Sequence, residues 1–325
     1  MTSPRTSCVG GRPAVEAVFY SLAFGGSEIA PLQLVKSLES VRFFHPDLPV
    51  FVYLFGEAPP DFLRQLRQLH AEVRHLGDHR AYIARTEPVR AELFALDPKI
   101  HRWLVLEEPE LKACTRLLYI DSDTLFFAPP SKLFERYRDA DLYAREEPFC
   151  RRSIHGYDPA LVDEEGIAGL RASEGLGPVP PFNTGVCLFS RAMADAVTTI
   201  LPQYFEYLFR FLAWFHLNPL SRSTGINSTP ITDERYLRPA AKRALPYKSE
   251  NRWIVDQVAL WLALGRFTNL RYGDFAPSDV WQGGEFQQLS TSARFPILCH
   301  YFGSNTMQFF DLLQRILASG GTTWR

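Results

Sequence analysis

RLLYIDSDTLFF, residues 116–127, carries the clearest structural signal in the chain. A run of apolar residues leads directly into Asp121 and Asp123, and a second apolar run follows. The first run has the composition of a strand that is buried on both faces, as in a parallel sheet. The two carboxylates are therefore expected at the carboxyl end of that strand, where open α/β sheets bind their ligands.

A single residue, Ser122, separates the two acidic side chains. Two carboxylates this close repel each other unless a cation lies between them. Mn²⁺ or Mg²⁺ is the obvious candidate, because a hard divalent ion takes oxygen ligands and can keep positions for phosphate oxygens. A strand that ends in an ordinary polar turn gives the same pattern, so the rest of the chain has to decide.

The segments before this stretch alternate between strand and helix patterns. Strands are predicted for residues 15–23, 49–55 and 71–76, and helices for residues 29–44 and 59–69. This β-α-β-α-β order favours a parallel, right-handed, doubly wound sheet. The Gly-Gly pair after the first strand is not a GxGxxG fingerprint, so a dinucleotide site is not indicated.

The later segments continue the α/β pattern, with two long interruptions. We predict strands at residues 141–144, 182–189 and 295–302, and helices at residues 98–113, 132–137, 203–217, 253–264 and 308–318, the first of these running into a linker. The polar stretches 146–181 and 218–252 are too long for ordinary connections. We interpret both as insertions on the substrate side of the fold.

The composition is that of a globular protein and excludes some classes of function. Of 325 residues 46% are hydrophobic, and 35 basic residues balance 36 acidic ones to a net charge of −1. No basic block stands out, so nucleic-acid binding has no electrostatic support. The five cysteines show no CxxC pair or zinc spacing. Cys187 and Cys299 lie in apolar runs, which suggests reduced thiols and a reducing compartment.

Targeting signals are not evident, so we expect a cytoplasmic protein. Residues 1–13 predict a flexible arm without a signal-peptide pattern, and no run of about 18 apolar residues indicates a transmembrane segment. The most aromatic segment is QYFEYLFRFLAWFHL, residues 203–217. It predicts a core helix or the face of a homodimer, and a helix that lies on a membrane surface is the alternative.

Four short segments together point to one family. In this order and spacing, LLYIDSDTLFF, FNTGVCLFS, DQVALWLAL and CHYFGSN resemble family 8 glycosyltransferases, the glycogenin and galactosyltransferase-like group with a GT-A fold. The resemblance implies an α/β protein with a Rossmann-like, mostly parallel sheet flanked by helices. It implies one domain over residues 14–318, with a nucleotide-sugar half at 14–145 and an acceptor half at 146–318.

The resemblance also implies a set of donor-binding residues. Asp121 and Asp123 would hold Mn²⁺, or Mg²⁺, on the donor diphosphate, with Ser122 beside the donor and His300 as the third protein ligand of the metal. An imidazole beside two carboxylates suits Mn²⁺ better than Mg²⁺. Gly303 would let the backbone approach the phosphates.

Catalytic roles are implied for three further residues. Asn183 matches the asparagine that faces the donor sugar, and Asp256 with Gln257 matches the pair near the sugar and the acceptor. The family retains the anomeric configuration, so retention is implied here as well. A turn residue at Asn183 and a favourable helix N-terminal charge at Asp256 are the simpler alternatives.

The phosphate end of the site departs from the family pattern. Where the family commonly carries a lysine after His-x-x-Gly, this chain has Thr306. Lys99 and Arg102 lie upstream of the acidic strand and could face the diphosphate, although a solvated helix face is the simpler interpretation. Tyr20 and Ser21, at the end of the first strand, could contact uracil or ribose.

The function that follows is transfer of a sugar from a UDP-sugar to the hydroxyl of an unknown acceptor, which could be a glycan, a protein or a small metabolite. A haloacid-dehalogenase-type phosphatase is an alternative, with Asp121 as nucleophile and Asp123 as acid/base. A sugar nucleotidyltransferase and a non-catalytic sugar-binding protein keep the fold but change the activity.

Overall fold

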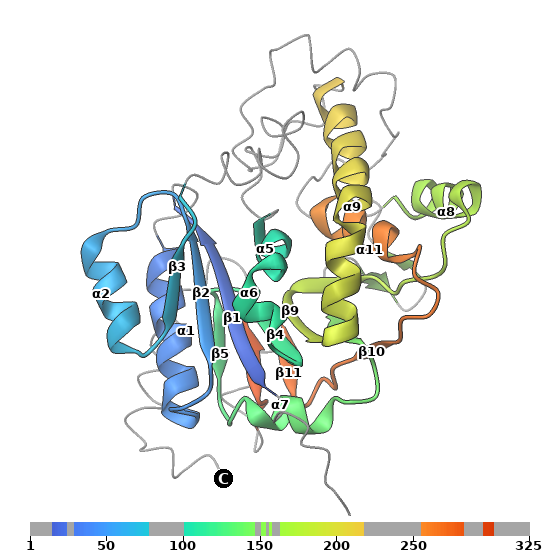
Figure 1. The fold of residues 1–325 in the computed structure, drawn as a ribbon. Helices are drawn as coiled ribbons and strands as arrows, with labels where there is room; N and C mark the ends of the chain where they lie inside the picture. Colours follow the sequence, from blue (N-terminus) through green and yellow to red (C-terminus); the bar gives the residue numbers. More distant parts are fainter. Residues whose placement is uncertain are drawn as a thin grey trace, which may run out of the picture.

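The computed structural model describes residues 15–24, 29–77, 101–146, 151–153, 156–157, 163–217, 255–282 and 295–301 (Figure 1). Several predictions from the sequence lie outside these residues: Lys99, Gly303, Thr306, the stretch 218–252 and the helix expected at 308–318.

A seven-stranded sheet forms the centre of the molecule, in the order β10-β6-β9-β4-β1-β2-β3. Its strands are β1 (Glu16–Ala23), β2 (Val50–Phe55), β3 (Glu72–His75), β4 (Arg116–Ile120), β6 (Leu142–Glu146), β9 (Phe182–Ser190) and β10 (Tyr272–Asp274). Only β9 runs antiparallel to its neighbours in this sheet. The predicted mostly parallel α/β sheet is therefore confirmed, and it contains strands from both predicted halves of the chain.

Two small sheets lie beside the central one. The first joins β11 (Val280–Gln282), β12 (Leu298–His300) and β5 (Thr124–Phe126), and the second pairs β7 (Arg151–Ser153) with β8 (Gly156–Tyr157). The stretch 116–127 thus contributes to two sheets, with β4 in the central sheet and β5 in a small one. The two acidic residues lie in the turn between them.

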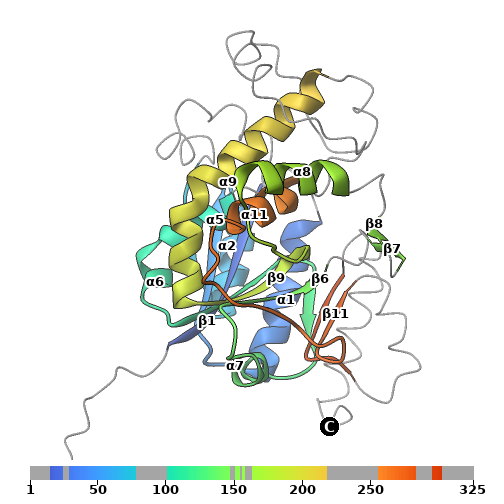
Figure 2. The ribbon, with the colours of Figure 1, turned by 90° about the vertical axis from the view of Figure 1, so that its right-hand side faces the viewer.

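Two layers of helices sandwich the central sheet (Figures 1 and 2). One layer contains α1 (Ala30–Phe44), α2 (Pro60–Gln68) and α7 (Ser131–Arg136). The other contains α5 (His101–Leu104), the 3-10 helix η2 (Val105–Glu107), α6 (Pro109–Lys112), α8 (Glu164–Glu174), α9 (Arg191–Leu217) and α11 (Val255–Leu264).

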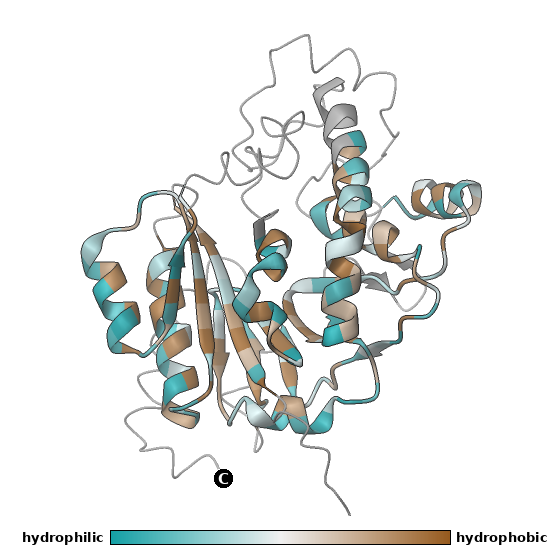
Figure 3. Cartoon of the chain, viewed as in Figure 1, coloured by the Kyte–Doolittle hydropathy of each residue, from teal (hydrophilic) through white to brown (hydrophobic). Residues whose placement is uncertain are grey.

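The strands supply both cores because their side chains alternate between the faces. On β1, Val18 and Tyr20 pack with α1 and α2, whereas Ala17 and Phe19 pack with α9 and α11. Hydrophobic residues accordingly dominate the central strands, as Figure 3 shows. None of the helices in the described part of the chain is long and apolar enough to span a membrane.

Three helical regions differ from the predictions. The helix expected at 203–217 begins at Arg191, because the Ser190 hydroxyl accepts the Met193 N–H at 3.1 Å and Pro202 is tolerated inside the helix. The stretch 146–181 contains α8, which Asp163 caps through the Gly166 N–H at 3.0 Å. The described part of the stretch 98–113 is three short helical turns instead of one helix and a linker.

Burial on both faces makes the centre of β4 sensitive to loss of volume. We expect Leu118→Ala to lower the free energy of unfolding by about 3 kcal/mol, because loss of this fully buried side chain would leave a cavity between the sheet and the helix layer of α1. Leu32→Ala is the matched control, since Leu32 is 49% exposed on α1. Urea unfolding followed by circular dichroism measures both, and equal losses would contradict the described packing.

Candidate metal centre

The turn between β4 and β5 is held in place from two sides. The Asp121 N–H donates to the Gly185 carbonyl of β9 at 2.8 Å, and the Thr124 hydroxyl donates to the Asp121 carbonyl at 2.9 Å. The Asp123 carbonyl accepts the Tyr301 N–H at 2.7 Å. The backbone of the acidic turn is therefore fixed to β9 and to the end of β12.

A network of hydrogen bonds among buried hydroxyl groups of β1, α1 and β5 supports this turn. Thr124 lies 2.8 Å from Ser37 of α1, and Ser37 lies 2.9 Å from the Tyr20 hydroxyl. Ser40, one turn further along α1, accepts the Phe126 N–H at 3.0 Å. The sequence signal was two serines on the buried face of α1, and our sequence reasoning missed it.

Tyr20 therefore has a structural partner that the sequence did not predict. Its hydroxyl is buried, and burial raises the pKa of Tyr20 well above its ordinary value, so the phenol stays protonated and bonds to Ser37. The contact of Tyr20 with uracil or ribose stays a prediction. The Ser21 hydroxyl is buried and has no hydrogen-bond partner within the described residues, and its predicted contact is likewise untested.

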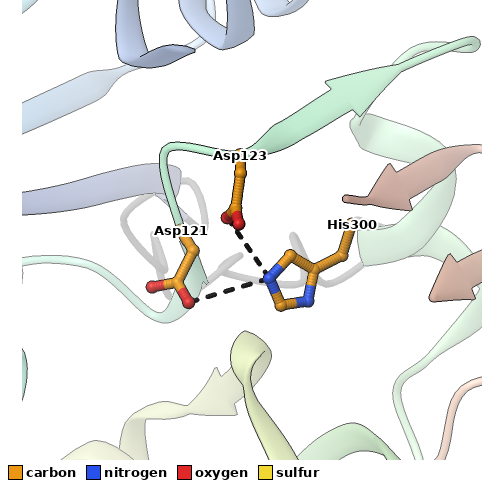
Figure 4. Close-up of side chains that lie close together, drawn as sticks. All are labelled: Asp121, Asp123 and His300. Atoms are coloured by element: carbon orange, nitrogen blue, oxygen red, sulfur yellow. Dashed lines mark ion pairs between the residues drawn. The ribbon is translucent and has the colours of Figure 1, made fainter. Parts of the chain in front are cut away.

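Asp121, Asp123 and His300 come together in space although 177 positions separate Asp123 from His300 along the chain. The His300 Nε2 atom lies 3.3 Å from Asp123 Oδ1 and 3.8 Å from Asp121 Oδ2 (Figure 4). One ligand atom from each residue lies within 4.8 Å of the other two. The three residues predicted as metal ligands thus form one cluster.

The strand register of the small sheet places the imidazole of His300 beside the acidic turn. β12 pairs antiparallel with β5, and His300 lies opposite Thr124, the first residue of β5. His300 is 3% exposed, whereas the side chains of Asp121 and Asp123 are 29% and 21% exposed. A ligand would therefore approach from the side of the carboxylates.

Gly185 leaves the space that the imidazole occupies. A Cβ atom at this position would lie 2.0 Å from His300 Cε1 and 2.8 Å from Asp121 Oδ2, which no side chain can tolerate without displacing them. The glycine of the FNTGV segment is therefore required by close packing against two metal-ligand candidates.

A buried guanidinium lies behind the acidic turn. Arg102 of α5 is 3.7 Å from Asp121 and 3.7 Å from Asp256, and it donates to the Thr184 hydroxyl at 2.9 Å. Burial alone would lower the pKa of Arg102, but Tyr119, Asp121 and Asp256 beside it raise this pKa above its ordinary value. The guanidinium therefore stays charged and fixes the two carboxylates relative to each other.

The carboxylate of Asp121 has a second donor. The Tyr119 phenol donates to Asp121 Oδ1, and its ring lies 5.5 Å below the Arg102 guanidinium. Burial raises the pKa of Tyr119, and so does Asp121, so the phenol remains a donor. Sequence reasoning placed Tyr119 only in the core and missed this contact.

The predicted catalytic residues line the start of β9 and α11. The Asn183 side-chain carbonyl accepts the Gly185 N–H at 2.7 Å, and the Gln257 side-chain carbonyl accepts the Thr184 N–H at 3.1 Å. With Asp256 they are buried next to the cluster. The structure therefore gives Asn183 and Gln257 a positioning role at β9, and their contact with a sugar stays a prediction.

The donor set fits a transition-metal ion. Two carboxylates and one imidazole offer two oxygens and one nitrogen, a combination that Mn²⁺ accepts more readily than Mg²⁺. Three protein ligands leave positions for the oxygens of a bound phosphate group. The metal itself is not identified by this geometry.

Comparisons with known proteins agree with this fold. No protein-family model matches the sequence, and neither does any curated protein. An active-site mutant of LgtC matches with a TM-score of 0.51 and 14% identity, over 92% of this chain and 95% of that chain. The bifunctional glycosyltransferase WbbM matches with a TM-score of 0.53 and 12% identity, over 98% of this chain and 53% of that chain. Mouse xyloside xylosyltransferase 1 matches with a TM-score of 0.49 and 12% identity, over 90% of this chain and 99% of that chain.

The class of fold is thereby established. LgtC is described as a galactosyltransferase that has been crystallised with donor and acceptor sugar analogues. At these identities the likeness concerns the fold, and the GT-A-type fold predicted from the sequence is confirmed.

We expect Gly185→Ala to weaken Mn²⁺ binding about 10- to 100-fold, the range seen when groups that orient metal ligands are altered. The added methyl group would displace the His300 ring. Gly169→Ala on α8 is the control, because no atom lies within 4 Å of its added Cβ. Isothermal titration calorimetry with MnCl₂ compares the two variants, and equal affinities would argue against His300 as a ligand.

Proposed function

We propose that this protein is a metal-dependent glycosyltransferase that moves a sugar from a UDP-sugar to an acceptor hydroxyl. The observation that carries the proposal is the convergence of Asp121, Asp123 and His300 at the carboxyl edge of a fold shared with LgtC. Open α/β sheets bind their ligands at this edge.

The three ligand candidates would hold Mn²⁺ against the donor diphosphate. When bound, the ion would neutralise the negative charge that grows on the departing UDP, which is Lewis-acid chemistry. Asp121 and Asp123 would orient the diphosphate, and His300 would fix the depth at which it binds. The transferred sugar would then face the start of β9, where Asn183 lies.

One buried carboxylate near the cluster, Asp256, could favour transfer at an anomeric carbon. That carbon becomes oxocarbenium-like, and a site that favours positive charge there lowers the barrier. Asp256 is the candidate for this role or for orientation of the acceptor. Its carboxylate lies 3.7 Å from the Arg102 guanidinium. Retention of configuration is the stereochemistry that the resemblance to the family supports.

The phosphatase alternative finds less support in the geometry. A haloacid-dehalogenase-type mechanism needs a carboxylate of Asp121 open to attack phosphorus. Here Asp121 Oδ1 accepts the Tyr119 phenol, and Asp121 Oδ2 faces the imidazole of His300. Clear turnover of p-nitrophenyl phosphate would reverse this preference.

A panel of donors tests the proposal directly. Purified protein with Mn²⁺ is incubated with each common UDP- and GDP-sugar, and nucleotide release is measured with and without EDTA. We expect EDTA-sensitive UDP release from at least one UDP-sugar, since many transferases slowly hydrolyse their donor when no acceptor is present. The proposal would be overturned if no sugar nucleotide in the panel released its nucleotide and the protein also showed no Mn²⁺-dependent binding of UDP.

The metal role predicts the behaviour of one conservative variant. Asp123→Asn should reduce Mn²⁺-dependent UDP release by about 100-fold or more, because it removes a charged ligand while keeping the shape of the side chain. Asp195→Asn on α9 is the control at an exposed carboxylate. Circular dichroism confirms that both variants fold, and wild-type rates for Asp123→Asn would rule out its role as a ligand.

A further inference from the structure

Outside the candidate metal centre, a concave feature lies further along the same sheet. It is a cavity of about 330 Å³ between β6, the start of β9 and β10. Its wall is mostly apolar and includes Ala144, Pro181, Phe182 and the ring of Tyr272. Two carboxylates, Glu146 and Asp274, also line it.

The lining of the cavity reaches the edge of the sheet at which the candidate metal centre lies. β4, β6 and β10 run in one direction, so Asp121, Glu146 and Asp274 all lie at the carboxyl ends of their strands. Only β9 separates β4 from β6 in the sheet. Two strand spacings place the cavity roughly 10 Å from the acidic turn.

The cavity and the Asp121 carboxylate also share a face of the sheet. Leu142, Ala144 and Phe182 of the cavity wall belong to the same hydrophobic cluster as Tyr119. The Tyr119 phenol in turn donates to Asp121. Because α9 and α11 cover this face, a molecule bound with its reacting hydroxyl near the candidate metal centre would reach the cavity along the carboxyl edge of the sheet.

We propose that the cavity binds an apolar group, such as an aromatic ring, that is attached to the acceptor sugar. This inference rests on the proposed glycosyltransferase function. The position is beyond the reach of the reacting hydroxyl itself, and apolar walls with a few polar groups are typical of ligand pockets of this volume. The oxygens of Glu146 and Asp274 would accept hydrogen bonds from hydroxyl groups of the attached sugar.

Tyr272 lines the cavity, and its hydroxyl is engaged by another element. The phenol donates to the Leu264 carbonyl at the end of α11 at 3.3 Å. Burial, together with Asp141, raises the pKa of Tyr272 to about 12, so the phenol remains a donor at neutral pH. The ring is therefore held by a hydrogen bond to another element and forms a fixed wall for stacking.

Binding of simple glycosides tests the inference without knowledge of the natural acceptor. The phenyl and methyl β-glycosides of glucose, galactose and xylose are titrated into the protein in the presence of Mn²⁺ and UDP, and their dissociation constants are compared by calorimetry. We expect the phenyl glycoside of at least one sugar to bind about tenfold more tightly than its methyl counterpart, a difference of about 1.4 kcal/mol.

Filling the cavity should remove this preference. Ala144→Leu places extra volume in the cavity, so we expect phenyl and methyl glycosides to bind it equally, with UDP release from the donor sugar unchanged. Tyr272→Phe is the matched control, because it keeps the ring and should keep the preference. Tyr272→Ala removes the ring and should lose it.

The outcomes separate this inference from the proposed function. If phenyl glycosides bind wild-type protein no more tightly than methyl glycosides, absence of binding included, the inference is wrong. A preference that persists in Ala144→Leu also overturns it. In both cases metal-dependent UDP release can still occur, whereas its absence would instead count against the glycosyltransferase proposal.

Discussion

The repulsion between the carboxylates of Asp121 and Asp123 is the constraint on which the rest of the site depends. Two like charges about 4 Å apart repel by about 4 kcal/mol at the effective dielectric constant near a protein surface. The described surroundings offset this repulsion with the Tyr119 phenol, which donates to Asp121, and with the positive charge of the Arg102 guanidinium 3.7 Å away. A divalent cation between the carboxylates would complete the compensation.

Close packing converts this charge arrangement into a fixed geometry. The acidic turn leaves the central sheet at β4 and enters the small sheet at β5, so it sits where two sheets meet. β12 pairs with β5 and places His300 against Gly185. Only a glycine at that position leaves room for the imidazole ring. Buried hydroxyl groups on α1 bond to both ends of β5, Ser37 to Thr124 and Ser40 to Phe126. The candidate metal centre therefore depends on contacts among four elements, α1, β5, β9 and β12.

The sequence predicted the parts of this arrangement that leave a local pattern. The apolar run before Asp121 identified β4, and the resemblance of short segments to a known family brought His300 into the metal cluster. The early onset of α9 could not be predicted, because a proline within the apolar pattern usually marks a helix boundary. The roles of Ser37 and Thr124 were also hidden, since a buried hydroxyl is recognisable only when its partner on another element is known.

The direction of the strands explains how one edge of the sheet can carry both the candidate metal ligands and the apolar cavity. Because β4, β6 and β10 are parallel, their carboxyl ends form a continuous edge, and only the antiparallel β9 interrupts it. The residues that would hold the donor lie at β4, whereas the apolar cavity lies at β6 and β10. Changes in the cavity wall should therefore leave the acidic turn undisturbed, since β9 lies between the two and the turn is fixed by its own backbone bond to β9 and by Arg102.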